Sequence, residues 1–123
     1  MEIKDAVTAL AALAQETRLS IFRSLVEVGP EGMSAGRLAE GLAIPGATLS
    51  FHLKELTRAG LISSRQEKQF IYYATDFKAM AELMTFLTKN CCQGMPETCL
   101  AGVQTALTRC CPPKASKNRR SRS

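Results

Sequence analysis

Two short apolar segments separated by a brief turn constrain this chain more than any other feature of its sequence. The first follows Ser34, a residue suited to cap a helix, and carries Leu38, Ala39 and Leu42. The second shows leucines at intervals of four and three, which places them on one helical face: Leu49, Leu53 and Leu56. Only residues 43–46, which include a proline and a glycine, lie between the two segments. Two short helices joined by so tight a connection indicate a helix-turn-helix.

With its leucines turned inward, the second of these helices presents its other face to the outside, as a recognition helix does in the major groove. The residues of this helix predicted to contact DNA are Ala47, Thr48, Ser50, Phe51, His52, Lys54 and Arg58. Phe51 is suited to touch a thymine methyl group, and packing against a neighbouring loop is the alternative. For His52, bracing the helix or touching a phosphate is favoured over binding a metal.

A β-hairpin is predicted directly after this helix. Residues 61–65 and 69–73 are rich in β-forming side chains, and residues 66–68 join them. Arg65 and Lys68 would place positive charge beside the phosphate backbone, a contact that supplies affinity without sequence information. The hairpin is therefore interpreted as a wing.

Further helices are predicted at both ends of this core. Val7, Leu10 and Leu13 recur at helical spacing, and a second helix covers residues 16–28. Asp76 is placed to cap a last long helix, whose apolar stripe favours a core or a dimer interface and consists of Met80, Leu83, Met84 and Leu87. The predicted fold is mostly α with a β-hairpin wing, a winged helix-turn-helix in the order α-α-α-α-β-β-α.

The length of 123 residues fits one small domain, which dimerisation would stabilise further. The first five residues are polar and of mixed charge, unlike a secretory signal, and no apolar stretch approaches the roughly 20 residues that span a bilayer. A cytoplasmic protein with reduced thiols is expected, which makes its five cysteines candidates for ligand binding or redox chemistry rather than disulfides.

The basic charge of the chain is a property of its C-terminal end. Residues 112–123 contain five of the 16 basic side chains and no acidic one, so residues 1–111 carry 11 basic and 11 acidic side chains. The predicted division is a DNA-binding and dimerisation domain over 1–111, with a cysteine sensor segment at about 91–111, and a basic disordered tail over 112–123.

The order of elements and three motifs resemble the ArsR/SmtB family of winged-helix metal-responsive repressors. The motifs are LAALAQETRL at 10–19, LSFHLKEL at 49–56 with AGL at 59–61, and IYY at 71–73, and the resemblance covers about residues 5–90. It implies that the first and last helices pair two protomers, and that two recognition helices then bind a palindromic operator in double-stranded DNA.

The chain departs from this family at its usual inducer sites. Many relatives carry a Cys-x-Cys or Cys-x-Gly element where this chain has SAG at 34–36. Others bind zinc through Asp and His residues of the last helices, but His52 is the single histidine here. Relatives also commonly have Gly-Arg near the wing tip, where this chain has Lys68 and Gln69.

Cysteines near the C-terminus offer a different inducer site. Cys91 and Cys92 stand at the end of the last predicted helix, and Cys99 follows a turn that contains Gly94 and Pro96. Thiolates are soft ligands that suit As(III) or Sb(III), and three sulfurs around trivalent arsenic form a pyramid. The arrangement resembles the arsenical-responsive branch of the family with a C-terminal cysteine site. No organic cofactor is expected.

Cys110 and Cys111 are assigned less readily. They would complete a four-thiolate zinc or cadmium site, form a second capture pair, or take no part in binding. We favour the last interpretation, because the residues that follow them are expected to be disordered.

The sequence thus predicts a homodimeric repressor that binds operator DNA and is released by As(III) or Sb(III). The first alternative is a redox switch in the same fold, with a disulfide between Cys99 and Cys91 or Cys92. A second is a DNA-binding protein with structural zinc. A thiol enzyme such as an arsenate reductase is not favoured, since no cysteine lies in a glycine-rich phosphate loop.

Overall fold

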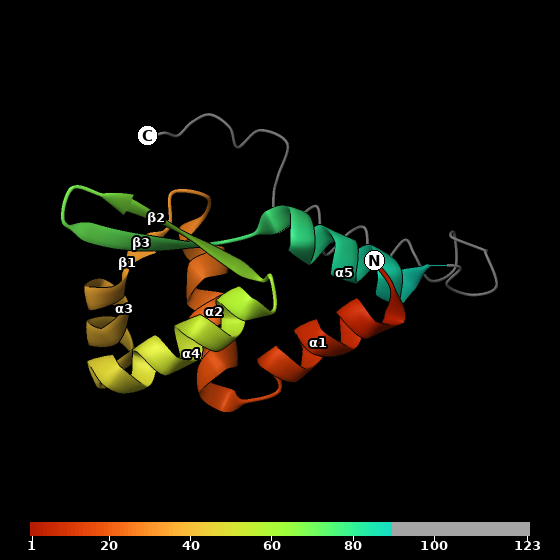
Figure 1. The fold of residues 1–123 in the computed structure, drawn as a ribbon, viewed down its shortest axis with the longest axis horizontal. Helices are drawn as coiled ribbons and strands as arrows, with labels where there is room; N and C mark the ends of the chain where they lie inside the picture. Colours follow the sequence, from red (N-terminus) through yellow and green to blue (C-terminus); the bar gives the residue numbers. More distant parts are fainter. Residues whose placement is uncertain (90–123) are drawn as a thin grey trace. The chain divides into compact units, whose positions relative to one another are not determined.

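The computed structural model describes residues 1–89, whose helices and strands follow the order of a winged helix (Figure 1). They are α1 (Ile3–Leu13), α2 (Glu16–Val28), β1 (Met33–Ser34), α3 (Ala35–Leu42), α4 (Gly46–Arg58), β2 (Ile62–Glu67), β3 (Phe70–Thr75) and α5 (Phe77–Thr88). The predicted fold class is confirmed, with one short strand, β1, that the sequence did not indicate. The sensor segment at 91–111, the tail at 112–123 and all five cysteines lie outside the described residues.

Residues at the helix ends fix where the two helices of the helix-turn-helix begin and end. The Oγ of Ser34 accepts a hydrogen bond from the backbone N–H of Arg37 at 3.4 Å, which confirms the predicted cap of α3. At the other end Ala43 adopts a left-handed conformation, with φ of 55°, and the chain reverses there. Helix α4 then begins at Gly46, directly after Pro45, whose ring fixes φ at a value that suits the start of a helix. The connection is as short as the sequence predicted.

The wing is part of a three-stranded antiparallel sheet in the order β1-β3-β2. Glu67 pairs with Phe70, so Lys68 and Gln69 alone form the turn at the tip. The predicted loop over 66–68 is therefore wrong in extent, because β2 continues through Gln66 and Glu67. Lys68 enables the shorter turn by taking a left-handed conformation with φ of 58°.

A glycine allows the unpredicted strand to reach the sheet. Gly32 has φ of 78°, and a Cβ atom at this position would collide with the backbone carbonyl of Tyr73. Directly after it Met33 pairs with Tyr73, and Ser34 with Tyr72. The loop before α3 is thus fastened to the central strand of the wing.

Residues 1–86 form one compact unit around a core rich in leucine. The largest fully buried side chains are Ile21, Leu25, Leu38, Leu49, Leu53, Leu56 and Leu61. The predicted cap of α5 is confirmed, since Asp76 Oδ1 accepts a hydrogen bond from the N–H of Ala79 at 3.0 Å. Within residues 1–89, no helix combines the length and the apolar content that a membrane crossing needs.

Helix α1 buries a face of small side chains, and Leu13 at its C-terminal end packs against the core. Its buried residues are alanines: Ala6, Ala9 and Ala12. Two of the three larger side chains that predicted the helix are exposed, Val7 at 59% and Leu10 at 42%, and Ile3 is 69% exposed. These three residues, spaced by four and three, form an apolar stripe that we call the α1 stripe.

Candidate nucleic-acid interface

One face of α4 is turned away from the core. Leu49, Leu53 and Leu56 are fully buried, whereas the exposed residues of the helix include Ala47, Thr48, Ser50, Phe51, Lys54 and Arg58. In Figure 1 the N-terminal end of α4 and the tip of the β2–β3 hairpin lie at the same end of the unit, and α1 lies toward the other end. The outward orientation predicted for these six residues is confirmed, and their contact with DNA stays a prediction.

Phe51 is the largest apolar side chain on this face. Its ring is 55% exposed. The ring meets that of His52 edge to face, with the centroids 5.4 Å apart and the planes at 63°. An aromatic ring that stays open to solvent on the outer face of α4 is available to a partner molecule.

His52 does not lie on the exposed face. It is 8% exposed, because it follows Leu49 by three residues and precedes Leu56 by four, which places it beside both on the buried side of α4. Its Nδ1 lies 3.4 Å from Nη1 of Arg18. The prediction that His52 contacts DNA is therefore corrected by its burial, and its position agrees with the alternative role of bracing the helix.

Arg65 of the wing is held by contacts within the chain. Its Nη1 donates a hydrogen bond to the backbone carbonyl of Glu31 at 2.8 Å, and its Nε donates to the carboxylate of Glu67 at 3.2 Å. The guanidinium carbon also lies 5.0 Å from the centroid of the Tyr72 ring, a cation–π distance. In this structure the guanidinium fixes the wing to the loop before β1. A phosphate bound by Arg65, as predicted, would therefore compete with Glu31 and Glu67 for the same N–H groups.

Three other cations are offered by the same elements. Arg58 pairs with Glu55 on its own helix at 2.9 Å, and both keep some exposure. Lys54 and Lys68 are exposed, and neither has an ion-pair partner within residues 1–89. Among the residues predicted to contact DNA, these two lysines are therefore the positive charges most available to a phosphate group.

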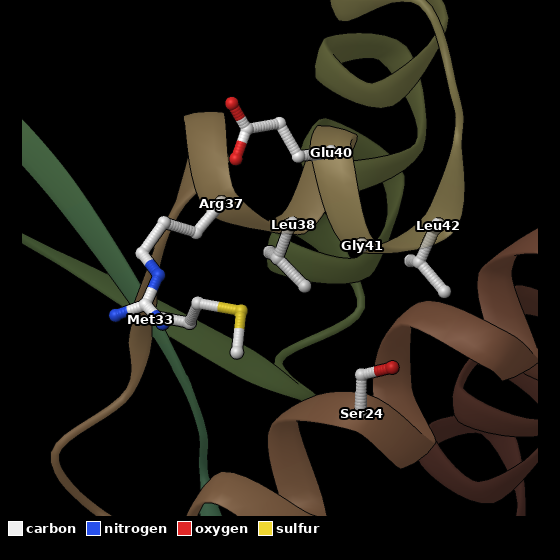
Figure 2. A pocket seen from close by; sticks show the side chains of 7 residues that line it. All are labelled: Ser24, Met33, Arg37, Leu38, Glu40, Gly41 and Leu42. Carbon is white, nitrogen blue, oxygen red and sulfur yellow. The ribbon is translucent and has the colours of Figure 1, made fainter.

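A hollow of about 400 Å³ lies beside α3, near the position of the inducer site that the sequence lacks (Figure 2). Its lining is Ser24, Met33, Arg37, Leu38, Glu40, Gly41 and Leu42, with no thiol or imidazole. In the part of the chain that the structure describes, no group of three potential metal ligands occurs. The predicted ligands Cys91, Cys92 and Cys99, and also Cys110 and Cys111, fall outside that part.

Known proteins with this arrangement regulate transcription. The model of a helix-turn-helix domain family, HTH_20, matches residues 13–65. The transcriptional activator HlyU of Vibrio cholerae is 39% identical over 82 residues, which cover 64% of this chain and 73% of HlyU. The nodulation protein NolR of Rhizobium meliloti is 35% identical over 79 residues, which cover 64% of this chain and 62% of NolR.

Solved structures similar to this fold also belong to transcriptional regulators or to proteins described as possible ones. Reduced HlyU from Vibrio cholerae has a TM-score of 0.57 at 32% identity and covers 72% of this chain and 90% of its own. A possible transcriptional regulator for arsenical resistance has a TM-score of 0.57 at 29% identity, over 64% and 79% of the two chains. The homodimeric winged helix-turn-helix domain of Mb0332 from Mycobacterium bovis, at 24% identity, shares the fold, with a TM-score of 0.59 over 70% and 77% of the two chains.

The fold, the exposed face of α4 and the wing define a winged-helix DNA-binding protein. The chain belongs to the ArsR/SmtB family of transcriptional regulators, as the motifs at residues 10–19, 49–56 and 71–73 indicated. It is a regulator of transcription and not an enzyme.

Proposed function

We propose that this regulator is a homodimeric repressor that binds operator DNA through α4 and the wing, and that As(III) or Sb(III) releases it by binding Cys91, Cys92 and Cys99. The observation that carries the DNA-binding part is the exposed face of α4, with Phe51 and Lys54, at the same end of the unit as the wing tip. The thiol cluster in the sequence carries the inducer part. The protein would act in the cytoplasm, where its thiols stay reduced.

The α1 stripe supports the homodimer. Ile3, Val7 and Leu10 form an apolar surface on one face of a helix whose other face is already buried. Contiguous exposed apolar residues mark interaction surfaces. A second copy of the chain is the proposed occupant, in keeping with the dimerisation through the first and last helices that the family resemblance implies.

Dimerisation supplies the geometry that DNA binding needs. Two recognition helices of a symmetric dimer meet half-sites roughly 34 to 36 Å apart on one face of the duplex. A small change in this span weakens both contacts at once. An inducer that binds the released form more tightly by about 3 kcal/mol would lower operator affinity roughly a hundredfold.

Soft-ligand chemistry supports the choice of inducer. Arsenic and antimony in the trivalent state prefer thiolates, and residues 1–89, which include α3, contain no cysteine. Within the described residues, the hollow beside α3 is lined by charged, small and apolar side chains, and its one sulfur atom is the thioether of Met33. One structural relative is described as a possible regulator for arsenical resistance, which favours the same class of inducer.

The test is a fluorescence anisotropy titration of the promoter fragment upstream of the gene with the full-length, reduced protein. Arsenite is then added in the presence of a phosphine reductant, which does not compete as a dithiol would. We expect release of the parent and of Cys110→Ser, the matched control outside the proposed ligand set, but no release of Cys99→Ser. Operator binding that arsenite leaves unchanged would remove the metalloid inducer and keep the DNA-binding function.

A thiol redox switch is the second candidate. HlyU, a relative at 39% identity, has a solved structure described as reduced, which supports a thiol redox switch as the alternative for this chain. Two thiols, Cys99 and Cys91 or Cys92, would lose two electrons and two protons to a peroxide, which is reduced, and form one disulfide. Release by peroxide that a thiol reductant reverses, together with insensitivity to arsenite, would establish this alternative.

A further inference from the structure

We propose that Arg18 is a positioning residue for DNA binding, which ties the recognition helix α4 to the end of α1 through His52. The inference rests on the proposed binding of DNA through α4, and it does not depend on which inducer the protein senses. It concerns a buried polar contact that the sequence analysis did not indicate.

Arg18 bridges two helices from a third. It lies in the first turn of α2, where its backbone N–H donates a hydrogen bond to the side-chain oxygen of Gln15 at 2.8 Å. Its guanidinium turns inward, so that Nε donates to the backbone carbonyl of Ala12 in α1 at 2.6 Å. Nη1 of the same group lies 3.4 Å from Nδ1 of His52 in α4. One planar cation therefore meets both helices.

The contact with α1 has a clear physical basis. Ala12 is the penultimate residue of α1, and the last four carbonyls of a helix lack partners within it. The last turn of α1 contains no basic residue, so Arg18 supplies the positive charge that this end of the helix dipole favours. A charge-assisted hydrogen bond of 2.6 Å fixes the guanidinium against the end of α1.

The contact with α4 predicts a particular tautomer of His52. A guanidinium only donates hydrogen bonds, so Nδ1 must act as the acceptor and the ring proton must lie on Nε2. The distance of 3.4 Å is slightly longer than a typical hydrogen bond, so the two groups are in polar contact and need only a small approach to form one. The same imidazole meets the ring of Phe51 edge to face, and Phe51 is 55% exposed on the proposed DNA-binding face. Consecutive contacts thus lead from Ala12 through Arg18 and His52 to Phe51.

Packing between α1 and α4 is incomplete, which gives this polar link more weight. A hollow of about 410 Å³ opens along the two helices, lined by Val7, Thr8, Ala11, Ala12, Arg18, Glu55, Arg58 and Ala59. Side chains that do not interdigitate along the full length of two helices restrain their relative position less. The exposed face of α1 is the proposed dimer surface. A displacement of α1 would then move α4 as well, because the guanidinium of Arg18 contacts both helices.

The experiment uses the full-length protein and four variants. Arg18→Gln removes the cation, and His52→Leu removes the acceptor while keeping an apolar side chain in the core. His52→Asn is the rescue variant, because its amide oxygen occupies nearly the position of Nδ1 and accepts a hydrogen bond. Arg23→Gln is the matched control, since Arg23 lies on the same helix, is 67% exposed and, within residues 1–89, pairs with Glu27 on the helix surface.

Two readouts separate positioning from general stabilisation. Operator affinity is measured by anisotropy, and sedimentation confirms that each variant is a folded dimer. The second readout is the ¹⁵N spectrum of the imidazole in the parent, which reports on His52 alone because the chain has one histidine. We expect the Nε2–H tautomer in the parent, about a tenfold loss of affinity in Arg18→Gln and in His52→Leu, no further loss in the double variant, and recovery in His52→Asn.

Several results would overturn the link. An Nδ1–H tautomer in the parent contradicts it without any variant, and so do Arg18→Gln and Arg23→Gln proteins that bind the operator equally well. If Arg18→Gln does not fold, Arg18→Lys provides the affinity measurement, since a lysine cannot meet both partners with one planar group. A parent that does not bind the promoter fragment counts instead against the proposed function.

Discussion

Helices α1 and α4 are of similar length and both carry apolar residues at helical spacing, but they use them in opposite ways. Helix α4 buries three leucines and exposes mainly small, polar or charged residues around Phe51. Helix α1 buries three alanines and exposes the α1 stripe of Ile3, Val7 and Leu10. The leucine face of α4 is covered by its own chain, whereas the apolar surface of α1 is covered only in part.

This difference shows what apolar periodicity can and cannot tell. A repeat of 3.6 residues identifies a helix and its apolar faces, but it does not state which face the chain itself covers. On α4 the leucine face meets the core. On α1 the small side chains allow close approach of the neighbouring helices, and the larger ones are left for another surface.

The largest effect is expected from a cavity in the buried face of α4. Leu53→Ala should lower the free energy of unfolding by about 2 to 5 kcal/mol, because the removed atoms leave a cavity in a packed core. Urea denaturation followed by circular dichroism measures the loss. Ser50→Ala, on the exposed face of the same helix, is the control and should change stability by less than about 0.5 kcal/mol. Equal losses in the two variants would contradict the assignment of faces.

A charge in the α1 stripe should disrupt the dimer. Val7→Glu would bury an unpaired carboxylate against the second copy, so the dimer dissociation constant should rise on the order of 100-fold, or about 3 kcal/mol. Sedimentation velocity over a range of concentrations measures it. Lys4→Glu introduces the same side chain elsewhere on the helix and should have a much smaller effect. A dimer that tolerates Val7→Glu as well as it tolerates Lys4→Glu would show that the α1 stripe faces something else.

Phe51 is the exception on the outer face of α4, and its removal should affect sequence selectivity. Phe51→Ala should weaken operator binding about tenfold, or about 1.4 kcal/mol, because an apolar contact with a thymine methyl group is lost. Replacing the contacted thymine by uracil removes the same methyl group from the DNA. The two changes together should cost no more than either alone, and additive losses would exclude the methyl contact.

The smallest effect is expected at the wing tip. Lys68→Asn removes a positive charge, and asparagine tolerates the left-handed conformation that Lys68 adopts. The logarithm of operator affinity should then depend on the logarithm of salt concentration with a slope smaller by about 1, with stability unchanged. Lys78→Asn, at an exposed lysine of α5, serves as the control. An unaltered slope would mean that the wing tip does not approach a phosphate.

The orientation of a predicted DNA-binding residue was predicted correctly where it depends on neighbouring residues of the same helix, but not where it depends on distant ones. The outward orientation of Ser50, Phe51 and Lys54 followed from their spacing relative to the leucines of the same helix, and it is confirmed. His52 was placed among the DNA-binding residues but is buried, because its spacing from Leu49 and Leu56 puts it at the edge of the leucine face, where the packing of other elements decides burial. Arg65 was identified as a cation in the wing, but its hydrogen bond to Glu31 joins residues 34 positions apart.

Local sequence patterns were sufficient to predict the helices, the caps of α3 and α5, the tight turn before α4 and the hairpin. Each of these depends on residues within a few positions of one another, such as Ser34 with Arg37 or Asp76 with Ala79. The three-dimensional structure was needed to show which face of α1 is buried, that β1 pairs with β3, and that Arg18 contacts His52, again 34 positions away. Local spacing sets backbone hydrogen bonds and caps, whereas contacts between distant residues depend on how side chains of particular size and charge fill the space between packed elements.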